Sequence, residues 1–212
     1  MNIIIMGPQA CGKGTQAKIL ADKLGYVHLS TGAMFRAEIE KKTELGKLAA
    51  SLINDGSSLV PDNINNSFVE EKVLKLNDQG KKVILDGYPR NVVQAKFAIE
   101  TLAIDKVILI ELSEEETIRR LQARYYCPKC KRDYNLLYPT LRPNIEGLCD
   151  VCNVDLVQRP DDSEVEFIKN RLKIYHEETE PMIKLFEVKL ARVDGHQAIE
   201  KVTEDIISSL SS

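Results

Sequence analysis

The chain has 212 residues, of which 43% are hydrophobic and 29% are charged, with a formal net charge of −3. That length suits one substantial core with small insertions. The charge gives no whole-protein attraction to nucleic acid or to an anionic membrane, and no apolar run approaches the ~20 residues of a membrane span. The N-terminal run MNIII lacks the basic region of a signal peptide. We therefore expect a cytoplasmic protein with neither membrane nor nucleic acid as a partner.

Five short runs rich in β-branched residues follow one another at residues 3–5, 26–29, 83–85, 107–110 and 190–193. Each is nearly continuously apolar, which is typical of strands buried on both faces of a parallel sheet. Helical stretches lie between them. One starts at Ser113, with Glu116 three residues later as in a capping box, and another runs from about Ser163 to Leu185. The alternation predicts an α/β fold with a doubly wound, five-stranded parallel sheet.

Two segments interrupt this alternation. Residues 31–61 predict short helices without a strand, and residues 125–158 contain four cysteines and several prolines and tyrosines without helical periodicity. We predict a core of residues 1–30, 62–124 and 159–212. A first lobe of residues 31–61 and a second lobe of residues 125–158 are inserted into it.

The run GPQACGKGT, from Gly7 to Thr15, follows the first strand and opens a helix. This is the G-x-x-x-x-G-K pattern of a phosphate-binding P-loop. Consecutive backbone N–H groups and a helix N-terminus form an anion site, and Lys13 adds a charge for the outer phosphates. A plain glycine turn with a surface lysine is the alternative, but the flanking strand and helix disfavour it. If the position of Ala10 requires a positive φ, that residue is strained.

The third strand ends in DGYPR, residues 86–90. An apolar strand that ends in an aspartate beside a P-loop is a Walker B arrangement, in which Asp86 can hold Mg²⁺ through water. The alternative is that Asp86 only ends a strand. A different motif is formed by Cys127-x-x-Cys130 and, eighteen residues on, Cys149-x-x-Cys152. This spacing predicts a four-thiolate, structural zinc site, which would stabilise a lobe too small for a core of its own.

The sequence GKGT after the loop, with DGYPR and the long cysteine-bearing insertion, resembles the adenylate kinase family over nearly the whole chain. This resemblance implies a P-loop fold, a monomer, and reversible transfer of a phosphoryl group from ATP to AMP, giving two ADP. It makes residues 31–61 an AMP-binding lobe and residues 125–158 a lid that closes over ATP. An extra residue around Ser57-Ser58 departs from the family pattern, as does Ala123-Arg124-Tyr125, where one arginine is missing.

The resemblance also assigns residues to sites. The ATP site would comprise Gly7, Ala10, Cys11, Gly12, Lys13, Gly14, Thr15, Arg120, Arg124 and Gln197. The AMP site would comprise Thr31, Gly32, Arg36, Val60, Gly87, Arg90, Gln94, Arg159 and Arg171. The charges around the transferring group would come from Lys13, Arg90, Arg120, Arg124, Arg159 and Arg171. Without the family context, Arg36 is an ordinary helix-face arginine, and Arg120 and Arg124 are a solvated pair.

Phosphoryl transfer needs positioning and neutralised charge, with Mg²⁺ bridging the donor phosphates. The acceptor oxygen of AMP is already ionised at neutral pH, so no general base is needed. Cys11 is interpreted as a small side chain that fills the loop, and His28, His176 and His196 are given no catalytic role. Two alternatives stay open: a UMP or CMP kinase, which usually has a short lid, and a zinc-ribbon nucleic-acid-binding module with a vestigial P-loop.

Overall fold

The computed structural model describes residues 1–53, 60–159, 162 and 164–210. The extra position at Ser57-Ser58 and the lid-exit residues Pro160 and Asp161 lie outside the described residues.

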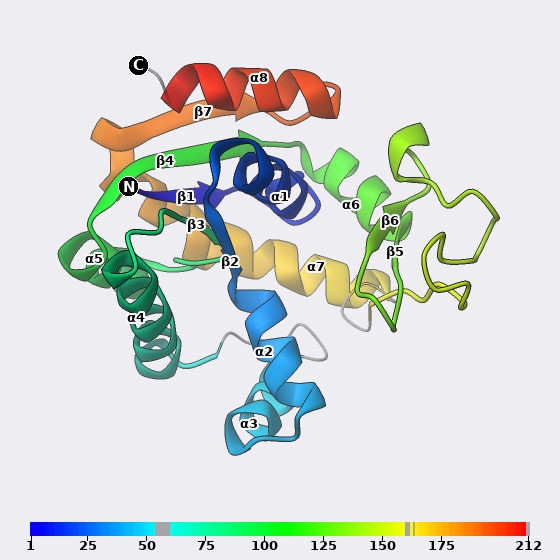
Figure 1. Cartoon of the computed structure of the whole chain (residues 1–212), viewed down its shortest axis with the longest axis horizontal. Helices are drawn as coiled ribbons and strands as arrows, with labels where there is room; N and C mark the ends of the chain where they lie inside the picture. Colours follow the sequence, from blue (N-terminus) through cyan, green and yellow to red (C-terminus); the bar gives the residue numbers. More distant parts are fainter. Residues whose placement is uncertain (54–59, 160–161, 163, 211–212) are drawn as a thin grey trace.

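Five strands form one parallel sheet (Figure 1): β1 (Asn2–Met6), β2 (Val27–Ser30), β3 (Val83–Asp86), β4 (Ile104–Glu111) and β7 (Leu190–Asp194). Their order is β2-β3-β1-β4-β7, and every neighbouring pair is parallel. The predicted strands and the α/β fold class are therefore confirmed. Because β1 is central, the loop that follows it lies at the middle of the carboxyl edge, where open α/β sheets bind ligands.

Side chains from alternate strand positions fill two cores, one on each face of the sheet. Ile3 and Ile5 pack with residues of α1 (Lys13–Leu24) and α8 (Ile199–Leu210). Ile4 and Met6 pack on the opposite face, with residues of α4 (Asp62–Asp78) and α5 (Val92–Thr101). Both faces are covered, which explains why the strands are continuously apolar and do not alternate with polar residues.

The helical segment that follows the lid changes its geometry along its length. α7 (Val165–Ile174) is α-helical, η3 (Tyr175–Thr179) is a π-helical turn, and η4 (Glu180–Lys189) is a 3₁₀-helix. The single helix predicted over residues 163–185 is corrected to this succession. Pro181 lacks an N–H group and cannot donate the hydrogen bond that an α-helix needs there.

The two interruptions of the sheet form small units with their own packing. α2 (Thr31–Glu40) and α3 (Glu44–Ile53) follow β2 and project away from the sheet (Figure 1), around Phe35, Ala49 and Val60. Between α6 (Glu114–Gln122) and α7, β5 (Arg124–Tyr126) and β6 (Asp133–Asn135) pair as an antiparallel hairpin, followed by η1 (Pro139–Leu141). Among the described residues, no helix has both the length and the apolar character needed to span a membrane.

The start of α6 forms only half of the predicted capping box. The Ser113 hydroxyl accepts a hydrogen bond from the Glu116 N–H at 3.3 Å. The Glu116 carboxylate does not return to the Ser113 N–H, which donates instead to His196 Nε2 at 3.3 Å. The carboxylate points to two arginines on the next turn of the helix. Charge pairing three and four residues along a helix therefore replaces the second half of the cap.

Candidate active site

The phosphate loop runs from the end of β1 to the start of α1. Gly7 has a φ of 141°, and a Cβ there would lie 2.2 Å from the Ile110 carbonyl oxygen. Gly12 has a φ of 104° and caps α1 without a side-chain hydrogen bond. Ala10 has a φ of 54°, so the strain considered for this position is present. The loop thus brings the first-turn N–H groups of α1 and the charge of Lys13 to the edge of the sheet.

Lys13 and Cys11 complete the loop from inside. Lys13 Nζ donates to the carbonyl oxygens of Gly7 at 2.8 Å and Pro8 at 2.5 Å, and lies 3.6 Å from Cys11 Sγ. Cys11 is 2% exposed and belongs to the core beneath the loop, so its interpretation as a filling side chain is confirmed. Thr15 is half-buried on the first turn of α1.

Asp86 ends β3 beside this loop, and a Cβ on Gly14 would lie 3.5 Å from its carboxylate. His28 Nε2 lies 3.1 Å from Asp86 Oδ2. Burial raises the pKa of Asp86, but the hydrogen bond from His28 and the charge of Lys13 outweigh it and hold this pKa below its usual value. An ionised, buried carboxylate therefore lies beside the end of the phosphate loop, where α1 begins.

His28 is a site residue that the sequence interpretation missed. Ser30 pairs with Asp86 in the register of β2 and β3. His28 lies two residues before Ser30, so both side chains point to the same face of the strand. The two-residue spacing between His28 and Ser30, together with the pairing of Ser30 and Asp86, is the signal that could have identified His28.

The residues assigned to the AMP site gather after β2 and β3. Gly87 O accepts hydrogen bonds from Thr31 Oγ1 and from Arg90 Nε, both at 2.8 Å. A Cβ on Gly32 would lie 3.1 Å from Arg36 Nη1, so Arg36 folds back over the start of α2. This close packing makes one cluster from two chain segments that are more than fifty residues apart.

Two other residues that the sequence analysis assigned to the AMP site are buried. Gln94 is 0% exposed: its Oε1 accepts from the Arg90 N–H at 2.9 Å, and its Nε2 donates to Asp62 Oδ1 at 2.8 Å. These bonds make Gln94 a brace for Arg90. Val60 packs with Phe35 and Ala49 in the lobe formed by α2 and α3, and its assignment to the AMP site stays a prediction.

Arginines at the base of the lid converge on buried or half-buried carboxylates. Asp162 Oδ2 accepts from Arg124 Nε at 2.7 Å and Nη2 at 2.5 Å, and Asp162 Oδ1 accepts from Arg171 Nη1 at 2.6 Å. The Asp162 side chain is 0% exposed. Arg159 Nη2 donates to Asp133 Oδ1 at 2.6 Å. The structure thus brings Arg124 and Arg171 together through an aspartate that the sequence interpretation had not singled out.

Two further residues that the sequence analysis assigned to the ATP site, Arg120 and Gln197, lie around the end of β7. Arg120 is buried and donates to Gly195 O at 2.8 Å and to Ala10 O at 3.4 Å, which joins the β7 end to the phosphate loop. Gln197 Nε2 donates to Asp205 Oδ2 at 3.0 Å and to Asp194 O at 3.1 Å. Gln197 is thus held between the end of β7 and α8, next to the segment that Arg120 contacts.

The four lid cysteines form one cluster, in which all four Sγ atoms lie within 4.8 Å of one another. The Cys130 N–H donates to Cys127 Sγ at 3.3 Å, and the Cys152 N–H donates to Cys149 Sγ at 3.4 Å. Burial raises the pKa of Cys149, but hydrogen bonds from Tyr134 and the backbone lower it to about 6. The two Cys-x-x-Cys turns therefore converge as a set of soft donors suited to a metal ion.

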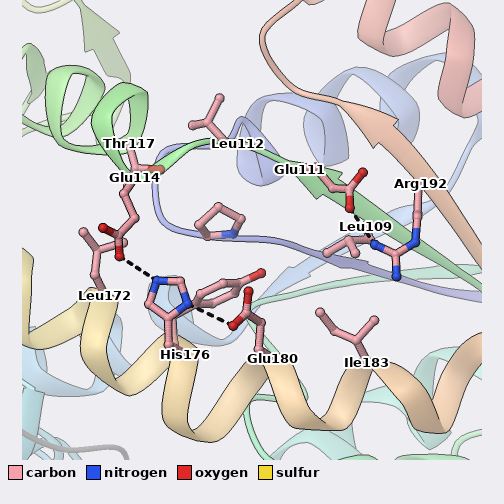
Figure 2. A pocket seen from close by; sticks show the side chains of 12 residues that line it. Leu109, Glu111, Leu112, Glu114, Thr117, Leu172, His176, Glu180, Ile183 and Arg192 are labelled. Atoms are coloured by element: carbon pink, nitrogen blue, oxygen red, sulfur yellow. Dashed lines mark hydrogen bonds and ion pairs between the residues drawn. The ribbon is translucent and has the colours of Figure 1, made fainter.

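A cavity of about 180 Å³ lies between the end of β4, the start of α6 and η3 (Figure 2). His176 bridges Glu114 at 2.8 Å and Glu180 at 2.9 Å, and Arg192 pairs with Glu111 at 2.5 Å. The hydrogen bond to Glu180 raises the pKa of His176, burial opposes it, and Glu114 adds to it. The cavity lining includes Pro8 of the phosphate loop but none of the residues that the sequence analysis assigned to a nucleotide.

The phosphate loop on a central parallel strand, the adjoining buried carboxylate and the converging arginines define a P-loop enzyme that handles phosphorylated nucleotides. The family profile described as adenylate kinase matches residues 5–191. The chain belongs to the adenylate kinase family. As a member it is an enzyme that converts ATP and AMP into two molecules of ADP.

Relatives named adenylate kinase match the chain along its full length. The protein from Petrotoga mobilis is 42% identical, with 100% of this chain and 98% of the relative covered. The protein from Kosmotoga olearia is 42% identical, with both chains fully covered. The protein from Clostridium acetobutylicum is 41% identical, with 97% of each chain covered. These matches include the core and the lid together, which disfavours both a short-lid kinase and a separate zinc-ribbon module.

Proposed function

We propose that this enzyme transfers the outer phosphoryl group of ATP in line to AMP, with Mg²⁺ assistance and closure of the lid. One observation carries the proposal. The phosphate loop follows β1. Gly87 and Arg90 follow β3, the strand directly beside β1, and Thr31 donates a hydrogen bond to Gly87. Two phosphate-binding sites therefore lie side by side at one edge of the sheet, as transfer between two nucleotides requires.

Mg²⁺ would be held near Asp86, which fits the ion in two respects. Its carboxylate is ionised by its surroundings, and it adjoins the start of α1, where ATP phosphates bind. The ion supplies charge neutralisation on the donor phosphates. His28 holds the carboxylate in place through the 3.1 Å contact.

The basic side chains neutralise the charge of the transferring group. Lys13 gives up its bonds to the loop carbonyls and takes the outer phosphates of ATP. Arg90 takes the AMP phosphate from its braced position beside Gly87. As the lid closes, Arg124 and Arg171 leave Asp162 and bind phosphate oxygens. Arg159 leaves Asp133 and does the same. Planar guanidinium groups match both carboxylate and phosphate, so this exchange keeps their hydrogen bonding.

The metal in the lid is zinc in this proposal, held by Cys127, Cys130, Cys149 and Cys152. Zn–S bonds of about 2.3 Å in a tetrahedron place sulfur atoms about 3.8 Å apart, which the present cluster can accommodate. Four thiolates leave no open position, so the metal is structural. The predicted division into core, AMP-binding lobe and lid, the cytoplasmic location and the monomeric state all stay predictions.

Steady-state kinetics of two variants test the assigned roles. Arg36→Ala should raise the KM for AMP with little change in kcat, because its contact is made in the ground and transition states alike. Lys13→Ala should lower kcat by about 100-fold or more, because it removes charge stabilisation of the transferring group. A Lys13→Ala enzyme that shows only a changed KM would contradict the role of Lys13.

A further inference from the structure

Glu116 lies on α6, and its carboxylate accepts more hydrogen bonds than a helix-capping role requires. Its Oε2 accepts from Arg119 Nε at 2.7 Å. Its Oε1 accepts from Arg120 Nε at 2.7 Å, from Arg119 Nη2 at 3.0 Å and from the Tyr138 hydroxyl at 3.4 Å. The Glu116 side chain is 15% exposed. One carboxylate therefore links two arginines of the core helix to a tyrosine of the lid.

Arg120 is the most constrained member of this group, because its side chain is 7% exposed. Each of its three guanidinium nitrogens has an acceptor: Nε has Glu116, Nη1 has the Ala10 carbonyl, and Nη2 has the Gly195 carbonyl. The two carbonyls belong to the phosphate loop and to the segment after β7. Of the three acceptors, only Glu116 carries a full negative charge, so it contributes the strongest hold on the guanidinium.

The tyrosine completes the arrangement on the lid side. The guanidinium carbon of Arg120 lies 5.2 Å from the centre of the Tyr138 ring, within the range of a cation–π contact. Glu116 thus bonds the edge of the guanidinium and the hydroxyl of the ring that lies over it. These three side chains therefore connect α6 to the residues that follow β6.

Arg119 is the second charged partner of Glu116. It is 60% exposed, and its influence on the lid residue Tyr138 is electrostatic. The hydrogen bond from Arg119 lowers the pKa of Glu116. Burial opposes this effect, but Arg120 adds to it, and the pKa falls to about 2. The carboxylate therefore stays ionised throughout the neutral range. Arg119 keeps it charged, and Arg120 and Tyr138 receive the orienting effect.

We propose that Glu116 is a positioning residue for ATP, which acts by holding Arg120 and Tyr138 in one fixed arrangement between the phosphate loop and the lid. The inference rests on the proposed role of Arg120 in ATP binding. Without Glu116, Arg120 keeps its two carbonyl acceptors but loses its charged partner, and the Tyr138 hydroxyl loses its acceptor. ATP binding must then order groups that are already ordered in the native enzyme.

The test is a kinetic cycle of Glu116→Ala, Arg120→Ala and the double variant, with Glu115→Gln as the control. Glu115 is the exposed neighbour on the same helix turn. Glu116→Ala should raise the KM for ATP about tenfold, which corresponds to about 1.4 kcal/mol and falls within the coupling range of contacting residues. The KM for AMP should change less than twofold. Glu115→Gln should leave both KM values unchanged.

The double variant shows whether Glu116 acts through Arg120. Its KM for ATP should match that of Arg120→Ala within about twofold, because the orienting effect has no target once Arg120 is gone. Glu116→Gln keeps the shape without the charge and should give an intermediate KM; it carries the same test if Glu116→Ala fails to fold.

The outcomes separate the inference from the function on which it rests. If Arg120→Ala leaves the KM for ATP unchanged, the role of Arg120 itself is wrong. If Arg120→Ala raises that KM but neither Glu116 variant does, the positioning role is overturned. Equal rises in both KM values with a lower Tm, or effects that add fully in the double variant, would show that Glu116 only supports the fold.

Discussion

Gly7→Ala is the substitution whose cost the structure sets most clearly. The added Cβ would meet the Ile110 carbonyl oxygen at 2.2 Å and Cys11 Sγ at 2.8 Å. The first contact is with backbone, so no side-chain rotation relieves it, and β1 must move away from β4. Overpacking of this kind costs about 1–3 kcal/mol. The φ of 141° adds about 1–2 kcal/mol for a residue with a Cβ.

Together these costs lower the stability by about 3.5 kcal/mol, taking the middle of both ranges. For a protein of this size, 1 kcal/mol corresponds to about 2–4 °C in Tm, so Gly7→Ala should lose about 7–14 °C. Gly25→Ala is the matched control. Gly25 ends α1 with a φ of 70° and has no atom within 4 Å of the added Cβ. It should cost about 1 kcal/mol, or about 2–4 °C.

Thermal unfolding followed by circular dichroism measures both losses in one buffer. The same samples should show that Gly7→Ala weakens ATP binding, because the phosphate loop shifts with β1, whereas Gly25→Ala does not. If Gly7→Ala loses no more stability than Gly25→Ala, the contact between the loop and the Ile110 carbonyl is not the constraint described here.

Two further predictions concern the lid and the cavity. Elemental analysis of enzyme purified without added metal should find one zinc per chain; Cys130→Ser should lower the Tm and raise the KM for ATP more than that for AMP, because the metal stabilises the lid. Iron or no metal in the native enzyme would contradict this. His176 has a raised pKa, so its ion pairs with Glu114 and Glu180 are fully formed below the unfolded value of about 6.5. They are lost as the pH rises through the higher folded value. The Tm advantage over His176→Gln should therefore be larger at pH 6 than at pH 9, and a constant difference would refute it.

The sheet could be predicted from the sequence because its signals are local. Each strand is a short apolar run, and each face of the sheet buries alternate residues of the same run. The phosphate loop could also be predicted from a local signal, its glycine pattern. Gly7 and Gly12 have positive φ values, and so does Ala10. The helix after the lid was predicted in place but not in geometry, because the pattern of apolar residues does not show how Pro181 alters the hydrogen bonding.

The partners of the arginines could not be predicted because they are distant in the chain. Asp162 meets Arg124 across 38 positions, and Asp133 meets Arg159 across 26. Such pairings depend on how the lid folds back on the core, which no local spacing records. For Glu116 a local pattern gave a wrong prediction. Its spacing from Ser113 fitted a capping box, but its carboxylate binds two arginines on the next turn instead.

Acceptor choice tests the central claim most directly. A coupled assay should measure kcat/KM for ATP and Mg²⁺ with AMP, UMP, CMP and GMP as separate acceptors. The cluster of Thr31, Gly87 and Arg90 beside the phosphate loop is proposed to bind AMP, so AMP should be preferred by a large factor, with no transfer when Mg²⁺ is removed. A kcat/KM for UMP or CMP equal to that for AMP would contradict the account.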